Sequence, residues 1–363
     1  MDEYKIGFLG AGGIAKVHAY ALQSLKYYYE NPPLIKCVSV SSLRNESRTA
    51  FAGKYGFERA ENVETFLKSD DMNAIFIMGS NNSHFAHFEA TMQMPGVKRI
   101  YLEKPVCSNE SEEKSMKELL DKSGKQVQVG FQYLQTPAVR EALKLWHSGI
   151  LGKPIHFDLK YYHGDYLHQS YRDKRKTRLT PAPDGGAMAD LGSHGISLLI
   201  AFLGNNLQLT GALQAGDFSD VPANSDLFSS ISLTDPVTKA AGCLSASRIS
   251  SGTGDLVSLE IYADKGMLRY SSQNADYFEY FMEDEGKWTR CPVGGNYAGI
   301  TSFPSGHVPA GWLRSMVHAH YLFFGGTDND AFIPDLQHGL EVQRIVRQTA
   351  LFLEEYRQKL NRL

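Results

Sequence analysis

An apolar run that leads straight into a glycine-rich turn and then a helical segment constrains this chain more than any other feature. YKIGFL is followed at once by GAGGIA near the N-terminus. A Gly-x-Gly-x-x-Ala turn between a strand and a helix is the fingerprint of a dinucleotide-binding fold. Gly10 allows the tight turn, Gly12 lets the backbone approach a pyrophosphate, and Ala15 lets the helix pack closely on the strand. The helix N-terminus then offers N–H donors to phosphate oxygens.

The next hundred residues alternate between strand-like and helical segments. The runs IKCVSVSS, NAIFIM, VKRIYLE and KQVQVGF predict strands, with the helical segments NESRTAFAGKYG, SHFAHFEATM and SEEKSMKELLDKSG between them. This alternation predicts a parallel sheet covered on both faces, which binds ligands at the carboxyl ends of its strands. After about residue 150, runs such as PIHFDLKYYH, LFSSISL, AAGCLSASRI, LVSLEIYA and MLRYSS predict antiparallel strands instead.

Length and composition limit the classes of function. The chain has 363 residues, enough for two domains, with 42% hydrophobic residues and a net charge of -3. Nothing in that charge favours nucleic acid or a membrane surface as a partner. The N-terminus MDEYKIGFLG opens with acids and leads straight into a strand-like run, whereas a signal peptide carries basic residues and then a longer apolar stretch. The four cysteines are scattered without a CxxC pair. We therefore expect a cytoplasmic protein without a structural metal site.

The segment after the second strand bears on the choice of cofactor. An enzyme restricted to NAD usually has an acidic residue here, which bonds the ribose 2′-hydroxyl. This chain reads SSLRN, with Ser42 and Arg44 in that place. Both can donate hydrogen bonds to a 2′-phosphate, and bonds to charged groups contribute roughly 1.5–3 kcal/mol each. The sequence therefore favours NADP over NAD, unless Arg44 simply points to water.

Four motifs in order resemble those of the Gfo/Idh/MocA family of nicotinamide-dependent oxidoreductases: GAGGIA, GSNNSH, EKPV and GGAMADLGSH. The segments PAVREALKLWHSGILGKP and PDLQHGLEVQRIV extend the likeness over nearly the whole chain. The resemblance implies an α/β Rossmann domain, here residues 1–131, that binds NAD(P). It also implies an α+β C-terminal domain, here residues 132–363, with a large, open, mostly antiparallel sheet. One face of that sheet commonly packs on another subunit, so we expect a homodimer or homotetramer.

The resemblance also implies the residues that contact the cofactor. The family usually has Thr-Pro-Asn where this chain has Gly79-Ser80-Asn81, and often Trp-Arg where it has Thr177-Arg178. Contacts near the nicotinamide are therefore expected to differ, and the stacking surface of the tryptophan is absent. The expected cofactor contacts are Gly10, Gly12, Gly13, Ile14, Ala15, Ser42, Arg44, Asn81, His84, Glu103, Lys104 and Arg178.

In the family, the chemistry falls on residues that correspond here to Lys104, Asp190 and His194. Histidine titrates near neutral pH and can take the proton of an alcohol. A charged lysine can hydrogen-bond the reacting oxygen. Residues four apart share a helix face, so Asp190 can bind a hydroxyl and tune His194. A cis bond at Lys104-Pro105 that aims the lysine inward is a further hypothesis.

The stretch DGGAMADLGSHG, residues 184–195, has two interpretations. In the simpler one it is a helix entry, with Gly185 and Gly186 in a turn and Asp190 as a first-turn acid. In the functional one it is the floor of a hydride-transfer site, whose glycines leave room for the nicotinamide and the sugar. The set of motifs favours the second.

The substrate pocket is expected to draw on aromatic and polar residues that suit a sugar or cyclitol. Tyr133, Tyr162, His163 and Tyr166 are the candidates, with Asp190 and His194. The basic segment YRDKRKTR is interpreted as a solvated loop, apart from Arg178. His307, in a Gly/Pro-rich loop, is a weaker candidate.

The sequence leaves three classes of function open. The first is an NAD(P)-dependent dehydrogenase or reductase acting on a sugar, sugar derivative or cyclitol. The second is a redox-neutral enzyme that cleaves glycosides with a tightly held nicotinamide. The third is a non-catalytic nucleotide-binding sensor, which would not need Lys104, Asp190 and His194 together.

Overall fold

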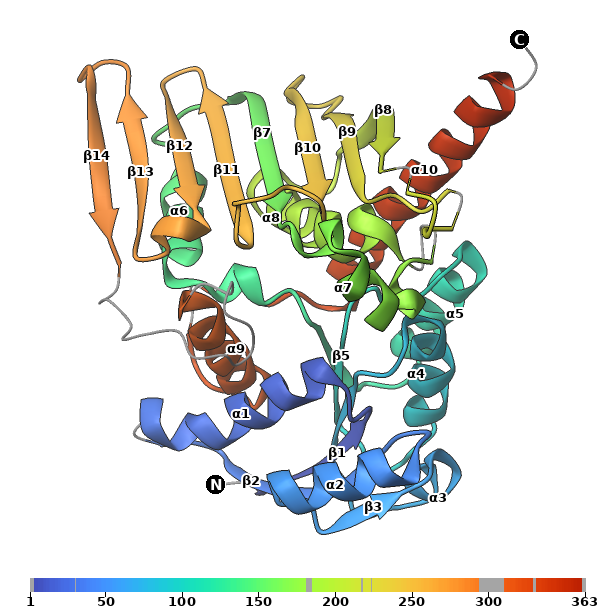
Figure 1. Ribbon diagram of the computed structural model, residues 1–363. Coiled ribbons are helices and arrows are strands. Elements are labelled where there is room, and N and C mark those ends of the chain that lie inside the picture. Colours follow the sequence, from blue (N-terminus) through green and yellow to red (C-terminus); the bar gives the residue numbers. More distant parts are fainter. Residues whose placement is uncertain are drawn as a thin grey trace. The chain divides into compact units, whose positions relative to one another are not determined.

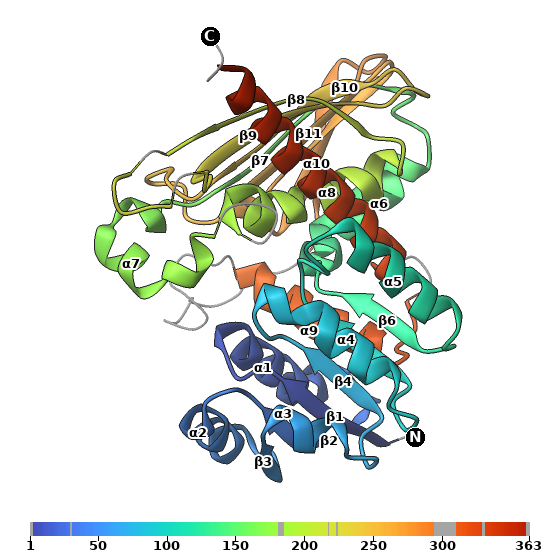
Figure 2. The ribbon, with the colours of Figure 1, turned by 90° about the vertical axis from the view of Figure 1, so that its right-hand side faces the viewer.

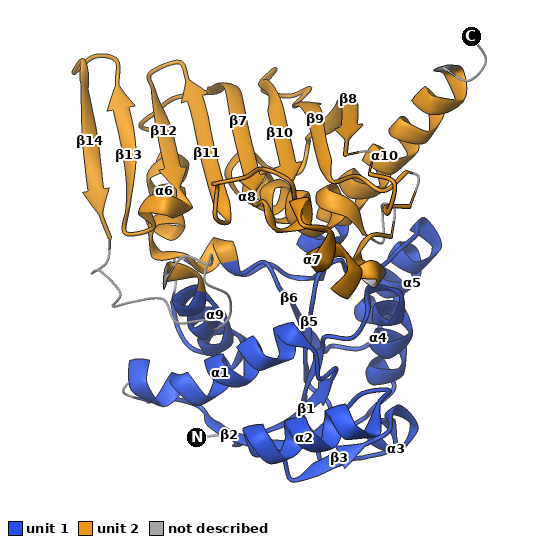
Figure 3. Cartoon of the chain, viewed as in Figure 1, with its two compact units in different colours: residues 1–132, 313–340 blue, residues 133–312, 341–363 orange. Residues whose placement is uncertain are grey.

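The computed structural model describes residues 3–29, 31–180, 185–216, 218–222, 224–293, 310–328 and 331–360. Asp184 and His307 lie outside these ranges. The chain divides into two compact units (Figure 3), of which unit 1 comprises Met1–Gln132 and Leu313–Leu340, and unit 2 comprises Tyr133–Trp312 and Glu341–Leu363.

Unit 1 contains a parallel sheet with the strand order β3-β2-β1-β4-β5-β6 (Figure 1). Its interior strands are apolar and buried, as expected for a sheet covered on both faces. The order reverses between β1 and β4, which is where open α/β sheets bind ligands. The strands are β1 (Glu3–Leu9), β2 (Leu34–Ser41), β3 (Arg59–Glu61), β4 (Ala74–Ile77), β5 (Arg99–Leu102) and β6 (Gln126–Val129).

Helices cover both faces of this sheet. In Figure 1, α1 (Gly13–Tyr28) lies on one side of the strands, and α4 (His84–Met92) and α5 (Glu110–Asp121) lie on the other. Local signals fix the ends of the shorter helices. The Asn62 and Asn109 side chains cap α3 (Val63–Leu67) and α5, and Gly56 ends α2 (Asn45–Tyr55) with a φ of 76°. Helix α1 begins at Gly13, within the glycine-rich turn.

Unit 2 is built on an eight-stranded sheet with the order β14-β13-β12-β11-β7-β10-β9-β8. Every neighbouring pair is antiparallel except β7 and β10, which run parallel. The strands are β7 (Pro154–Tyr162), β8 (Gln208–Ala215), β9 (Phe228–Thr234), β10 (Ala241–Ser247), β11 (Leu256–Ala263), β12 (Gly266–Ser271), β13 (Tyr277–Met282) and β14 (Lys287–Pro292).

The two faces of the unit 2 sheet have different surroundings. Helices α6 (Pro137–His147) and α8 (Ser193–Leu203) lie on one face, and Figure 2 shows both on the same side of the strands. Strand residues alternate between faces, so Phe157, Leu159 and Tyr161 are buried while Lys160 is exposed. The other face carries partly exposed polar and aromatic side chains on most of its strands. The fold is thus the expected Rossmann domain plus an open, mostly antiparallel sheet.

Residues 313–340 belong to unit 1, although the sequence placed everything after residue 131 in one domain. The reason is local packing: in α9 (Ala310–Phe323), His320 bonds to His18 of α1, and the Pro334 carbonyl accepts from Val129 N of β6. Helix α10 (Leu336–Leu360) then continues into unit 2. No periodic pattern in the sequence reports such a return to an earlier domain.

The described residues also bear on membrane spans, metal sites and disulfides. No helix among them has the length and apolar character needed to cross a membrane. They hold no cluster of three or more His, Cys, Asp or Glu placed to bind a metal ion. The four cysteines are free thiols.

Candidate functional site

The turn between β1 and α1 is shaped to receive a phosphate. Gly10 has a φ of +133°, and its N–H donates to the Ser41 carbonyl at 2.8 Å. A Cβ there would collide with the Met78 backbone, whereas the Cβ positions of Gly12 and Gly13 face open space. Helix α1 begins without a side-chain cap and without an acid in its first turn. Its first N–H groups therefore remain available to an anion, so this turn fits a dinucleotide pyrophosphate.

The loop after β2 holds the two residues expected to select the cofactor. The Ser42 hydroxyl donates to the Arg44 carbonyl at 3.2 Å, and Arg44 is exposed at the N-cap of α2. Arg48, which the sequence analysis did not single out, braces this loop: its Nη1 donates to the Ser42 carbonyl at 3.0 Å. The loop therefore presents an arginine and a hydroxyl next to a helix N-terminus.

His84 is placed inside unit 1 and not on its surface. It begins α4, directly after the short helix that opens at Asn81, and is 1% exposed. Its Nδ1 lies 2.6 Å from the Pro105 carbonyl oxygen, and its Nε2 lies 3.3 Å from that of Gly79. Burial lowers its pKa, which favours the neutral ring. We infer that His84 acts on a cofactor only through the loops that it joins.

The residues that follow β5, including Lys104, are also held by buried contacts within unit 1. Glu103 is 6% exposed, and its Oε1 lies 2.9 Å from Nε2 of His18 on α1. A Cβ on Gly130 would collide with the Glu103 carboxylate, so glycine is required beside it. Lys104 is half-buried, and the Lys104-Pro105 bond is cis, as hypothesised. Lys104 therefore follows a buried anchor, and the Glu103 carboxylate points into unit 1.

In unit 2, residues 186–195 belong to one helical segment, which includes a π-helical turn, Met188–Gly192, and continues as α8. Asp226 caps its start: its carbonyl accepts from Ala187 N at 2.9 Å, and its Oδ2 accepts from Met188 N at 2.7 Å. π-turns inside helices often occur at functional sites because they change which side chains project. This turn contains Asp190.

The glycines of this stretch are explained by packing. Gly186 has a φ of +83°, and a Cβ there would collide with Asp226. A Cβ on Gly185 would meet the Thr180 carbonyl, and one on Gly195 would meet Leu159 and Leu244 of the sheet. The helix-entry interpretation therefore accounts for them, and their assignment as room for a nicotinamide and a sugar is not needed.

Asp190 is held by two arginines. Its Oδ2 accepts from Arg248 Nη2 at 2.7 Å, and its Oδ1 accepts from Arg178 Nη1 at 3.3 Å. Arg248 is 1% exposed, donates a further bond to the Arg178 carbonyl at 2.7 Å, and lies over the Tyr166 ring. This arrangement fixes Asp190 as a carboxylate. Arg248 follows β10 in an unremarkable sequence, SASRIS, and nothing in the residues around it predicts this role.

His194 is enclosed by two tyrosines. Its ring packs edge-on against Tyr133, with centroids 5.4 Å apart, and lies 6.0 Å from the Tyr161 ring. The Tyr133 hydroxyl donates to that of Tyr161 at 3.1 Å, and burial raises the pKa of both phenols well above the ordinary value. The sequence analysis named Tyr162 instead of Tyr161. The strand's alternation puts Tyr161 on the face of Phe157 and Leu159, and Tyr162 on the opposite face.

His163 lines a separate pocket of about 380 Å³ within unit 2. The pocket is formed by the end of β7 and the loop before β11, and it is lined by His163, Gly164, Asp165, Leu167, His168, Ser251, Gly252 and Gly254. Nearby, Arg172 of the basic segment is 5% exposed and bonds Asp220 through Nε and Nη2 at 2.7 and 2.9 Å. The segment is therefore not simply a solvated loop, because Arg172 anchors it.

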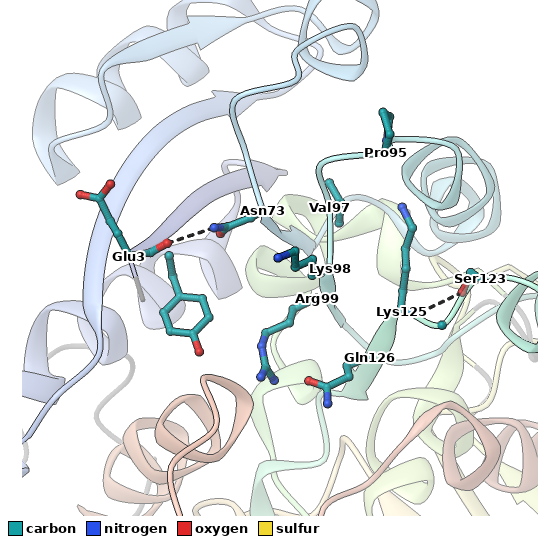
Figure 4. Close-up of a pocket in the computed structure, with 11 residues that line it drawn as sticks. Glu3, Asn73, Pro95, Val97, Lys98, Arg99, Ser123, Lys125 and Gln126 are labelled. Carbon is teal, nitrogen blue, oxygen red and sulfur yellow. Dashed lines mark hydrogen bonds between the residues drawn. The ribbon is translucent and has the colours of Figure 1, made fainter. Parts of the chain in front are cut away.

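A groove of about 690 Å³ in unit 1 lies at the other edge of the parallel sheet, by the amino ends of β1, β5 and β6 (Figure 4). Two of its cations, Arg99 and Lys125, are already engaged. Arg99 Nη1 donates to the Phe323 carbonyl at 2.6 Å, and Lys125 Nζ donates to the Thr91 carbonyl at 3.2 Å. In Figure 4 the Lys98, Arg99 and Lys125 side chains point in different directions. This groove is therefore not the candidate site.

The chain is similar in sequence and in fold to several dehydrogenases. Glucose-6-phosphate 3-dehydrogenase of Bacillus subtilis is 28% identical over 54% of this chain and 52% of its own length, so the match spans about half of that relative. Levoglucosan dehydrogenase of Pseudarthrobacter phenanthrenivorans is 22% identical over 78% of each chain. A solved levoglucosan dehydrogenase, in complex with NADH and L-sorbose, superposes with a TM-score of 0.82 at 19% identity over 98% of both chains.

Family models match both parts of the chain. Residues 4–131 match the oxidoreductase family with an NAD-binding Rossmann fold. Residues 139–269 match the GFO/IDH/MocA C-terminal domain. The first match contains the Gly10 turn, and the second contains the Asp190–His194 segment. The chain therefore belongs to the GFO/IDH/MocA family of oxidoreductases.

Proposed function

We propose that the protein is an NAD(P)-dependent dehydrogenase or reductase that transfers a hydride between nicotinamide and a hydroxyl or carbonyl carbon of a sugar, sugar derivative or cyclitol. The observation that carries the proposal is the Asp190–His194 segment, in which the carboxylate is held by Arg248 and the imidazole is enclosed by Tyr133 and Tyr161. The relatives named as glucose-6-phosphate and levoglucosan dehydrogenases support a sugar as substrate.

The chain's own residues divide the chemistry. A bound nicotinamide would supply the hydride acceptor or donor. His194 takes the hydroxyl proton as general base, which typically contributes roughly 10²–10⁴-fold to the rate. Lys104 donates a hydrogen bond to the reacting oxygen and stabilises its negative charge.

Asp190 has a binding role in this proposal. A carboxylate offers about four lone-pair positions. Arg248 and Arg178 each donate to one oxygen of Asp190, which sets the direction of the carboxylate. A carboxylate oriented in this way can accept hydrogen bonds from the hydroxyls of a polyol. Because the arginines keep Asp190 ionised and engaged, it is a poorer candidate for the base than His194.

The preferred cofactor in this proposal is NADP, with NAD as the alternative. Exposed Arg44 and the Ser42 hydroxyl support it, because both can donate to a 2′-phosphate. Binding of NADPH and NADH should be compared by fluorescence titration for the native protein and for Arg44→Ala. A loss of affinity confined to NADPH supports the preference, and equal losses for both cofactors contradict it.

The proposed assembly is a homodimer or homotetramer formed through the open face of the unit 2 sheet. That face carries Trp288, which is 45% exposed, and the pairs that Arg269 and Arg290 form with Glu279. Such a mixture of an aromatic and organised charges suits a protein interface. Sedimentation equilibrium tests it: Trp288→Glu should shift the assembly toward smaller species, and a native monomer would exclude it.

The first experiment is reduction of NADP and NAD by the purified protein across sugars, sugar acids and inositols, with His194→Asn in parallel. Turnover that collapses in the variant supports both the reaction class and the base. Turnover that is unchanged in the variant excludes His194 as base. If no compound is oxidised and nucleotide is released on denaturation, the redox-neutral alternative gains support.

A further inference from the structure

Two buried histidines of unit 1 form a hydrogen-bonded chain that the proposed reaction does not use. His18 of α1 and His320 of α9 are both fully buried. His320 Nδ1 lies 2.6 Å from the Met316 carbonyl oxygen, and its Nε2 lies 2.9 Å from His18 Nδ1. His18 Nε2 lies 2.9 Å from Glu103 Oε1. The chain thus runs from a helix carbonyl to the carboxylate next to Lys104.

The positions of the hydrogens in this hydrogen-bonded series follow from its two ends, the Met316 carbonyl and the Glu103 carboxylate. The Met316 carbonyl can only accept, so His320 Nδ1 donates to it. Burial lowers the pKa of His320 well below its ordinary value, so the ring is neutral and its Nε2 must accept. His18 Nδ1 is therefore the donor between the two rings. Its Nε2 then faces Glu103, and an ionised carboxylate also only accepts.

A hydrogen must consequently lie between His18 Nε2 and Glu103 Oε1. A neutral His18 would instead set a nitrogen lone pair against a carboxylate oxygen at 2.9 Å. Imidazole is a stronger base than a carboxylate in model peptides, which places this proton on the His18 ring. His18 is then an imidazolium with two donors, one to Glu103 and one to His320.

The surroundings make this arrangement costly to break. The Phe76 and Tyr101 rings lie 5.4 and 5.0 Å from the His18 ring, and both also stack on His320. An unpaired charge in such a cage has no water to replace its partner. The other titratable groups nearby are Tyr101, whose pKa burial raises well above its ordinary value, His84, whose pKa burial lowers, and Lys104.

We infer that His18, as an imidazolium, and His320, as its neutral acceptor, are positioning residues that hold Glu103 and through it Lys104. Glu103 N also donates to the Ile77 carbonyl at 2.9 Å, which ties the same residue to the end of β4. On the other side of Lys104, His84 holds the Pro105 carbonyl. Lys104 therefore lies between Glu103 and Pro105, each of which is held by a buried histidine. Its chemical role rests on the proposed function, whereas the proton on His18 does not.

The proton is tested by nitrogen NMR of the histidine rings in the full chain at neutral pH, without cofactor. His18 is assigned by the signal that disappears in His18→Gln. We expect both of its ring nitrogens to carry hydrogen, in contrast to the neutral ring of His338, whose pKa burial lowers to about 4. A neutral His18 in the native protein overturns the inference.

Glu103→Gln is the sharper variant because it should preserve packing. The glutamine amide can donate to His18 Nε2, so the extra proton is no longer needed and His18 should become neutral. His338→Gln, a buried histidine of unit 1 outside the chain, should leave the His18 signal unchanged. An imidazolium that persists in Glu103→Gln contradicts the inference.

Steady-state kinetics test the positioning of Lys104. Glu103→Ala, which removes the side chain that His18 holds, should lower kcat by roughly ten- to a hundredfold through misplacement of the lysine, with the KM for cofactor within about twofold. An active native protein with unchanged kcat in this variant overturns the positioning role. If no protein variant oxidises a sugar while the NMR result holds, the proposed function fails and the proton assignment survives.

Discussion

Arg248 Nη2 donates to Asp190 Oδ2 at 2.7 Å from a position where only 1% of the arginine is exposed. A buried guanidinium is stable only when its donors are paired, and Asp190 and the Arg178 carbonyl supply two acceptors here. The relationship is therefore mutual: the arginine needs the carboxylate to be buried, and the carboxylate is kept ionised and oriented by the arginine. In the proposed function, the direction of Asp190 is therefore set before a substrate binds.

Arg248→Met should reduce both stability and substrate recognition. Removing one partner of a buried ion pair typically costs about 3–5 kcal/mol, which should appear as a lower free energy of unfolding in urea. With its main donor gone, Asp190 should bind polyol hydroxyls less well, so kcat/KM for the sugar should fall more than about tenfold, since one buried charged bond contributes roughly 1.5–3 kcal/mol. Arg344→Met, which removes a partly exposed arginine of unit 2, is the control. Equal kinetics in the two variants would contradict the role of Arg248.

Tyr161 and Tyr162 offer a matched pair, because they are neighbours in sequence and lie on opposite faces of β7. Tyr161→Phe removes the partner of the Tyr133 hydroxyl beside His194. We expect a loss of about 0.5–1.5 kcal/mol in stability and a change in the pH profile of kcat, because the ring environment of His194 changes. Tyr162→Phe should alter neither. Identical pH profiles in both variants would count against an influence of Tyr161 on His194.

Much of the fold follows from sequence patterns because those patterns are local. The alternation of apolar strands and helices in residues 4–131 and the Gly10 turn are set by short-range preferences, and the structure has these elements where they were expected. Strands β3, β8, β13 and β14 were not predicted. β3 has only three residues, and β8 contains Gly211, which weakens a strand pattern.

The candidate site was only partly predictable, because its supporting residues come from distant positions. Arg248 and Asp226 lie 58 and 38 residues beyond their partners Asp190 and Met188. No spacing rule connects such pairs, which are brought together by the sheet. Tyr161 could have been predicted, because the buried residues Phe157 and Leu159 alternate along β7 and mark the face on which Tyr161 also lies.

Gly186→Ala should be among the most damaging single substitutions in unit 2. The residue has a φ of +83°, and a methyl group would collide with the Asp226 carboxylate that caps the helical segment containing Asp190 and His194. Backbone strain of about 1–3 kcal/mol would add to the loss of the cap, which contributes about 0.5–2 kcal/mol. Gly56→Ala is the control, with a φ of +76° and open space around its Cβ position. Urea unfolding should show a clearly larger loss for Gly186→Ala, and equal losses would mean that contact with Asp226 is unimportant.

Asp226 should make stability depend on pH in an unusual direction for an acid. Burial raises its pKa from 3.8 to about 6, against the opposing hydrogen bond from Met188 N. Because the folded-state pKa lies above the unfolded value, the folded protein holds this proton more tightly. The stabilisation of the folded state by protonated Asp226 is therefore fully present below about pH 4, is lost as the pH rises toward 6, and stays absent above it. A pKa difference of about two units between the unfolded and folded states corresponds to at most about 3 kcal/mol in the free energy of unfolding.

Asp226→Asn isolates this contribution, because asparagine keeps an oxygen that can accept from Met188 N and has no proton to lose. Free energies of unfolding in urea should be compared for the two proteins between pH 4 and pH 7. The native protein should lose stability relative to the variant as the pH rises through this window, and the difference should level off above about pH 6, since ionisation is complete beyond the folded-state pKa. A difference that is constant with pH would show that Asp226 is ionised throughout, held by Arg248 more strongly than burial opposes it.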